Sequence, residues 1–234
     1  MVFDLRSRVW EKHSLVCNFL IIIMDDSIIS QIHYSSAIIK HLISLSESGQ
    51  ASLAFFFFDF RDEEKKQDLR NFVTSLLCQL STYSSPCCKI LSRIYSTHGK
   101  GTQQPSNDTL TNCLREMLSV IVEPIYIIVD ALDECPNSSG IPTQREVVLN
   151  LLGGLVRLGQ PNLHICVTSR PEVDIDNVLG PLARTISLHD EIGQMKDISD
   201  YVSNFVASDW MMGRWRSAEK ELVIKELSEK ADGM

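Results

Sequence analysis

Apolar and polar positions follow two alternating patterns along this chain. Continuous apolar runs occur at residues 15–23, 51–60, 125–130, 162–170 and 183–189. Between these runs, apolar residues recur every three or four positions, which is typical of helices that bury one face. Short continuous runs separated by helices are typical of strands in a parallel sheet that is covered on both faces. The pattern therefore predicts a series of βαβ units.

The helical pattern is found at six places and again in the C-terminal tail. The predicted helices span residues 34–46, 68–82, 86–96, 108–121, 144–159 and 195–208, and the tail is predicted to be helical to about residue 231. Pro86 suits the first turn of its helix, Asp108 is the expected N-cap of the next one, and Gly159 ends the fifth. These helices alternate with the apolar runs, as a βαβ arrangement requires.

The predicted fold is α/β: a mostly parallel sheet flanked by helices, with a helical extension after about residue 190. Its crossovers are expected to be right-handed. Phe55–Phe58 are expected to form a central strand. Ligands bind to such sheets in a crevice beyond the carboxyl ends of the strands, so those ends are where chemistry is expected.

The composition narrows the classes of function. The 234 residues carry a net charge of −8, which argues against a nucleic-acid-binding surface. The seven cysteines show no CxxC pair and no zinc-type spacing, so reduced thiols in the cytoplasm are expected. The apolar segment 14–24 is too short to span a bilayer, and acidic residues follow it where a signal peptide would have a cleavage site. We therefore expect a buried strand there, and neither a membrane anchor nor secretion.

One apolar run ends in a group of acids. Residues 125–135 read IYIIVDALDEC, and Asp130 is the first acid after the apolar residues. In a site that hydrolyses a phosphate bond, an acid at a strand end orders Mg²⁺ and its waters. Asp130 is therefore the candidate magnesium ligand, and Asp133 and Glu134 are candidate catalytic acids that orient the attacking water. The competing interpretation is that these acids simply end a strand in solvent.

The next apolar run ends in the segment VTSRPE. Thr168 and Ser169 close the run, and Pro171 restricts the backbone beside Arg170. These residue types at a strand end can sense the terminal phosphate of a nucleotide, so Thr168, Ser169 and Arg170 are candidate cofactor-binding residues. An ordinary strand end with a surface arginine is the competing interpretation. Because both strand ends should lie at the same edge of the sheet, the acids and these residues are expected to share one crevice.

Four segments together resemble NACHT-type NTPase modules: FFFFDFRDEEKKQ, IYIIVDALDECP, NLHICVTSRPE and KADGM. The resemblance is closest to the fungal nephrocystin-like N-terminal group of the STAND class of signalling ATPases, and it covers residues 34–234. It implies a P-loop NTPase fold that binds ATP or GTP with Mg²⁺ and switches between closed and oligomeric states, usually between an effector and C-terminal repeats. By this resemblance, Asp130 corresponds to the metal-ordering acid, Asp133 to the catalytic acid and Arg170 to the sensor.

The resemblance also requires a phosphate-binding loop of the form GxxGxGK[ST], whose backbone N–H groups and lysine hold the phosphates. This loop is expected near residues 28–32, where the chain reads IISQI. The first glycine is Gly49, and Lys12 and Lys40 are the only lysines before it. The GKGT at residues 99–102 follows a predicted helix, with no strand leading into it. The chain as written therefore lacks the loop.

Two explanations for this remain open: a fragmentary or rearranged gene in which residues 1–33 are not the native start, or a genuine pseudo-NTPase. We accordingly expect a non-matching segment over residues 1–33, an NTPase-like core over 34–190 and a truncated helical extension over 191–234. The predicted function is a degenerate signalling module without bound nucleotide, which contacts other proteins or a second copy and neither nucleic acid nor membrane. The alternative is an active, Mg²⁺-dependent ATP- or GTP-binding switch.

Overall fold

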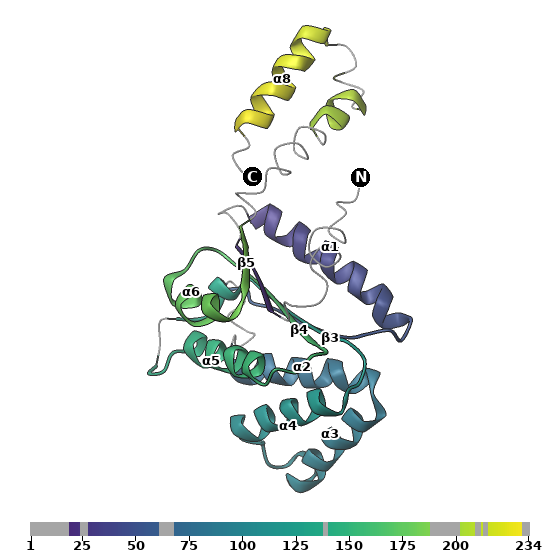
Figure 1. Cartoon of the computed structure of the whole chain (residues 1–234), viewed down its shortest axis with the longest axis vertical. Coiled ribbons are helices and arrows are strands. Elements are labelled where there is room, and N and C mark those ends of the chain that lie inside the picture. Colours follow the sequence, from purple (N-terminus) through teal and green to yellow (C-terminus); the bar gives the residue numbers. More distant parts are fainter. Residues whose placement is uncertain are drawn as a thin grey trace.

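Five parallel strands form a single sheet in the order β2-β3-β4-β1-β5 (Figure 1). The computed structural model describes residues 19–23, 28–60, 68–137, 140–187, 202–208, 212 and 215–230. The strands are β1 (Phe19–Ile23), β2 (Ser52–Phe57), β3 (Ile125–Asp130), β4 (Leu163–Ser169) and β5 (Arg184–Ser187). The predicted α/β fold with a parallel sheet is confirmed.

The helices follow the predicted pattern wherever the structure describes them. They are α1 (Ile28–Glu47), α2 (Leu69–Tyr83), α3 (Ser85–Thr97), α4 (Asn107–Val120), α5 (Gln144–Arg157), α6 (Val173–Leu179) and α8 (Ser217–Lys230). Of the helix predicted over 195–208, residues 202–208 are helical and the rest lie outside the described residues. Figure 1 shows α8 apart from the sheet and its covering helices. No helix within the described part of the chain is long and apolar enough to cross a bilayer.

The two faces of the sheet are covered by different helices. α1 lies on one face, where Ile38, Ile39 and Leu42 pack against alternate residues of the strands. The other face carries α2, α4, α5 and α6, and it holds the larger apolar cluster. Burial of both faces explains why the strands are apolar at nearly every position.

β1 and β4 are neighbours, and the chain runs from them to opposite edges of the sheet. The chain leaves β1 through α1 and returns at β2, on the far side of the sheet, whereas it leaves β4 through α6 and returns at β5. Ligands in open α/β sheets bind beyond the carboxyl ends of the strands at such a switch point. In the register of the sheet, Ile22 is opposite Thr168 and Ile23 is opposite Ser169, so the residues of VTSRPE border this crevice.

β2 is an edge strand, and the expectation of a central strand at Phe55–Phe58 was wrong. Within the described residues, β2 pairs with β3 alone. Phe56 and Phe58 pack on the face that α2 covers, where Phe72 lies edge-on to Phe56 with ring centroids 5.3 Å apart. Phe55 packs on the face that α1 covers. Continuous hydrophobicity reports burial of the two faces, and it does not report whether a strand has one neighbour or two.

One local expectation is also corrected. Ser106, and not Asp108, is the N-cap of α4, because its Oγ accepts the N–H of Thr109 at 3.1 Å and Asp108 lies inside the first turn.

Residues 28–32, where the phosphate loop of the family would lie, belong to the first turns of α1. β1 pairs with β4 on one side and β5 on the other, so residues from 19 onward contribute to the same sheet.

Candidate functional site

Asp130 is the last residue of β3, and its side chain is held inside the fold. The residue is 4 % exposed, and the hydroxyl of Thr168 on the neighbouring strand donates a hydrogen bond to its Oδ1. The same hydroxyl oxygen accepts the N–H of Ala131 at 3.1 Å. Thr168 therefore links the end of β4 to the carboxylate and the backbone that end β3. A buried carboxylate is stable only when such donors satisfy it.

Ala131 turns the chain sharply out of β3. Its φ of 55° and ψ of 48° lie in the left-handed region, which a small side chain tolerates better than a β-branched one. The turn starts the short 3₁₀ helix η3 (Leu132–Glu134), whose Leu132 is fully buried. This turn places Asp133 and Glu134, which follow Leu132, beyond the carboxyl end of β3.

Asp133 is engaged by Arg170. The backbone N–H of Arg170 donates to Oδ1 of Asp133 at 3.1 Å, and Nε of Arg170 lies 3.4 Å from Oδ2. The Asp133 side chain is 5 % exposed, whereas the arginine is about one-third exposed. The candidate catalytic acid and the candidate sensor are thus brought together as an ion pair that joins η3 to the end of β4.

Glu134 faces the chain that follows β2. Its Oε2 accepts the N–H of Phe60 at 3.2 Å. Partial burial raises the pKa of this carboxyl; the hydrogen bond from Phe60 opposes the shift, and the nearby carboxylates of Asp133 and Asp59 add to it. The acid therefore ties the ends of β2 and β3 together, with Asp133 and Asp59 as negative neighbours.

Ser169 completes the set of predicted residues, and its hydroxyl donates to the carbonyl of Arg170 at 2.7 Å. All six predicted site residues thus lie at the ends of two adjacent strands, as the sequence indicated. For each of them the structure shows a hydrogen bond or an ion pair within this edge.

Arg145 is part of this edge and was not predicted from the sequence. It lies in the first turn of α5 and is 7 % exposed. Its Nε donates to the carbonyl of Cys135 at 3.1 Å, its guanidinium also donates to the carbonyl of Asp133, and Nη1 lies 3.3 Å from Asp174. A charged residue beside a loop gives no periodic signal, so the sequence did not indicate a role for Arg145. The signal near it is the capping box of Thr143 and Glu146, which marks where α5 begins.

A nucleotide with Mg²⁺ needs ligands for the metal ion and hydrogen-bond donors for its phosphates. Among the described residues, no three His, Cys, Asp or Glu side chains form a cluster that could hold a metal ion. The connection from β1 to α1 is residues 24–27, Met-Asp-Asp-Ser, outside the described residues but known in sequence. In sequence it contains two acids and neither glycine nor lysine. A phosphate-binding loop supplies backbone N–H donors and a lysine.

Comparison with known proteins places this architecture in a family. The family model described as Nephrocystin 3, N-terminal, matches residues 32–170, which include β2, β3, β4 and every candidate site residue. The chain belongs to this family. The resemblance drawn from the sequence motifs is thereby confirmed at the level of the nephrocystin N-terminal domain.

Among solved structures, the nephrocystin-type chain is similar to the ORC1 protein of Aeropyrum pernix, which was solved in complex with DNA. The identity is 13 %, the match covers 85 % of this chain and 51 % of the ORC1 chain, and the TM-score is 0.44. The match thus spans about half the length of that protein. No curated protein matches the chain.

Proposed function

We propose that this nephrocystin-type domain is a non-hydrolysing signalling module that holds no nucleotide in the crevice between β1 and β4, and that acts through contacts with other proteins. The observation that carries the proposal is the four-residue connection from β1 to α1. β1 borders the topological switch point, where a phosphate would be held, and the four residues that follow β1 in sequence are Met-Asp-Asp-Ser.

The charge of this connection opposes phosphate binding. A phosphate loop supplies several backbone N–H donors and one lysine, and each charge-assisted contact of this kind contributes about 1.5–3 kcal/mol. Since about 1.4 kcal/mol corresponds to a tenfold change in affinity, losing several of these contacts weakens binding by many orders of magnitude. Two of the four residues are acids, Asp25 and Asp26, and they bring negative charge where a phosphate loop has a lysine.

The existing interactions of the edge acids support the same proposal. Asp133 contacts Arg170 through both oxygens, and Glu134 accepts the N–H of Phe60. Mg²⁺ in nucleotide sites is usually held by one or two carboxylates together with the phosphates, so Asp130 without a triphosphate is a weak site for this ion. In this account the acids stabilise the turns that end the strands.

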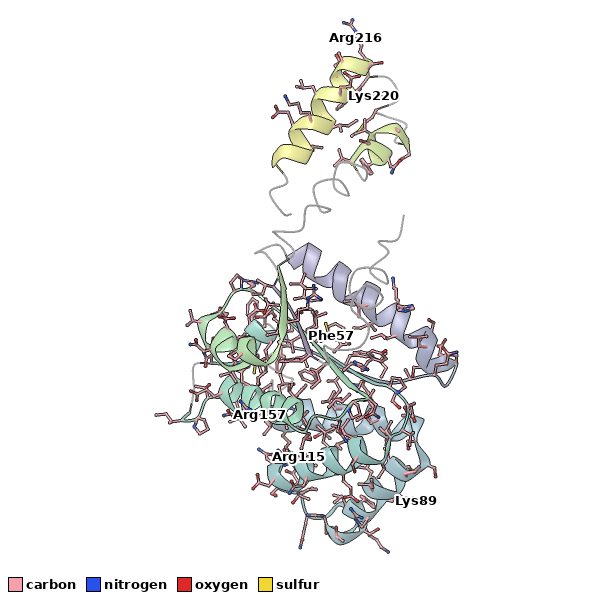
Figure 2. The ribbon with its side chains drawn as sticks, viewed as in Figure 1. Phe57, Lys89, Arg115, Arg157, Arg216 and Lys220 are labelled. Carbon is pink, nitrogen blue, oxygen red and sulfur yellow. The ribbon has the colours of Figure 1, made fainter. Side chains whose placement is uncertain are left out.

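Exposed aromatic residues beside this edge support a role in protein contacts. Phe57, labelled in Figure 2, ends β2 and is 45 % exposed, and Phe60 three residues later is 62 % exposed. Large apolar side chains that remain exposed together are typical of contact surfaces. The six described cysteines are all free thiols, which supports a reducing compartment such as the cytoplasm.

Family membership favours one alternative, an ATP- or GTP-dependent switch. In that case Asp130 would order Mg²⁺, Asp133 and Glu134 would act on the attacking water, and Thr168, Ser169 and Arg170 would sense the terminal phosphate. The placement of these residues at two adjacent strand ends is the feature in its favour. The proposal and the alternative differ in one property, which is nucleotide binding by this chain.

Thermal unfolding with and without nucleotide tests the proposal. A ligand that binds only the folded state at 100 times its Kd adds about 2.7 kcal/mol of stability. For a chain of this size that corresponds to a rise in Tm of roughly 5–10 °C. We expect millimolar ATP or GTP with Mg²⁺ to leave Tm at the value measured with Mg²⁺ alone.

The Asp130→Asn variant is the matched control. A nucleotide-dependent rise in Tm that this variant abolishes would establish the switch and overturn the proposal. A rise that persists in the variant would also overturn it, because nucleotide would then bind without the metal-ordering acid.

A further inference from the structure

The outer edge of β2 is covered by a side chain instead of a strand. Alternate residues of a strand direct their N–H and C=O groups to the same side, and in β2 those of Phe55 face away from β3. Gln79 of α2 bonds to both of these groups. Its Oε1 accepts the N–H of Phe55 at 3.0 Å, and its Nε2 donates to the C=O of Phe55 at 2.8 Å. One carboxamide thus makes the pair of hydrogen bonds that a neighbouring strand would make.

The carboxamide of Gln79 is fixed in this orientation from within α2. Its Nε2 also donates to Oγ of Ser75, one helical turn earlier, at 3.0 Å. α2 is itself anchored on β2, because the ring of Phe72 packs against Phe56 and Phe58 at centroid distances of 5.3 and 5.9 Å. The oxygen of the amide thus has a donor and its nitrogen has two acceptors, which fixes the orientation of the side chain.

The sequence of β2 explains why its edge needs covering. The strand reads SLAFFF, with no charge and no proline, and its last residue Phe57 is 45 % exposed. Exposed edges of aromatic, uncharged strands pair readily with other strands, and proteins usually prevent this with lysine, proline, bulges or a covering element. β2 itself has none of these residue-level protections, and among the described residues Gln79 of α2 bonds to its outer edge.

We propose that Gln79 keeps the β2 edge closed against pairing with the β2 edge of a second copy of this chain. A second copy is the expected occupant because the uncharged aromatic segment is complementary to itself and carries no charge that would select another partner. The inference is independent of whether the domain binds nucleotide, since Gln79 lies away from the strand ends on the outer side of β2.

The Gln79→Leu variant tests this directly. Leucine has a similar size and helix propensity but can make neither hydrogen bond to Phe55. We expect two results relative to the wild type at equal concentration. Sedimentation velocity should show a concentration-dependent shift to larger species. Hydrogen exchange at the Phe55 amide should be faster than in the wild type at low concentration, where the chain is monomeric, and should slow as the chain associates, because edge pairing protects this amide again. Gln79→Asn replaces Gln79→Leu if the leucine variant does not fold. The asparagine amide is one methylene too short to reach Phe55, so the same two results are expected.

Gln79→Glu is the matched control, because it separates edge pairing from lost stability. The carboxylate still accepts the N–H of Phe55, cannot donate to its C=O, and places a charge at the edge. It should therefore be less stable than the wild type and yet remain as free of association. The double variant Gln79→Leu with Phe57→Lys should also lose the association, because a lysine on an edge strand blocks pairing.

Two results would overturn the proposal. One is a Gln79→Leu protein that associates no more than the wild type. The other is a Gln79→Glu protein that associates as strongly as Gln79→Leu, since destabilisation alone would then account for the effect. Far-UV circular dichroism of each variant confirms that folded proteins are being compared.

Discussion

Asp133 has the surroundings of a structural acid. Oδ1 accepts the backbone N–H of Arg170, Oδ2 lies 3.4 Å from the guanidinium Nε, and the side chain is almost completely buried. Through these two contacts Asp133 links the turn after β3 to the end of β4.

Asp133→Asn should lower the free energy of unfolding by about 1–3 kcal/mol, because the amide can satisfy only one of the two donors of Arg170 and carries no charge. Urea unfolding followed by circular dichroism measures this. Asp108→Asn, in the exposed first turn of α4, is the control and should change stability by about 0.5 kcal/mol or less. Equal effects of the two substitutions would contradict the structural role of Asp133.

His164 should make the fold less stable in mild acid. Its ring stacks on Tyr126 at a centroid distance of 5.0 Å, and burial lowers the pKa of the imidazole below its ordinary value of about 6.5. Below that pH the unfolded chain binds a proton that the folded chain excludes. Stability contributed by the neutral ring is therefore present above about pH 6.5 and is lost as the pH falls, by up to about 1.4 kcal/mol per pH unit.

The His164→Phe variant isolates this contribution, since phenylalanine keeps the stacking on Tyr126 and does not titrate. Urea midpoints measured at about pH 7.5 and about pH 5.5 should fall less for the variant than for the wild type. Identical falls in the two proteins would show that His164 takes up its proton equally in the folded and unfolded states.

At the scale of elements, one arginine joins three segments. Arg145 belongs to α5, donates to carbonyls on both sides of Glu134 and pairs with Asp174 of α6. Arg145→Ala should destabilise the protein by about 3 kcal/mol or more, because it leaves buried acceptors without a donor. Arg157→Ala is the control, being exposed on the same helix (Figure 2), and should cost about 0.5 kcal/mol or less. Similar urea midpoints for both variants would contradict the account.

The helices and strands could be predicted from the sequence, but the order of the strands in the sheet could not. Periodicity located the helices and strands because it reports which faces are buried. It did not show that β2 lies at the edge, since the side chain of Gln79 replaces the second strand and leaves the same apolar run. Likewise Ser106 and Asp108 are both good N-caps, and the sequence alone did not distinguish which of them precedes the first helical turn of α4.

The residues of the candidate site could be predicted from the sequence, but most of their contacts could not. Adjacent strand ends brought Asp130 and Thr168 together as predicted, because both segments end parallel strands. The pairing of Asp133 with Arg170, and the part played by Arg145, depend on turn geometry after Ala131 that no spacing in the sequence reports. Sequence therefore located the residues of this edge, whereas the structure was needed to show which of them bind one another.

At the scale of the whole molecule, the sheet of this nephrocystin-type domain has a topological switch point between β1 and β4. The connection that follows β1 is four residues long in sequence, without glycine or lysine and with two acids. At the ends of β3 and β4, polar groups of the chain bind one another, and we propose that this edge needs no nucleotide to hold its structure. The expected behaviour is a domain whose stability and shape do not respond to ATP or GTP.

Isothermal titration of the chain with ATP and with GTP, each with excess Mg²⁺, measures this property most directly. The account predicts no saturable heat at nucleotide concentrations up to about 1 mM, which corresponds to a binding free energy weaker than about −4 kcal/mol. Saturable binding of one nucleotide per chain with a micromolar Kd, lost in Asp130→Asn, would contradict it.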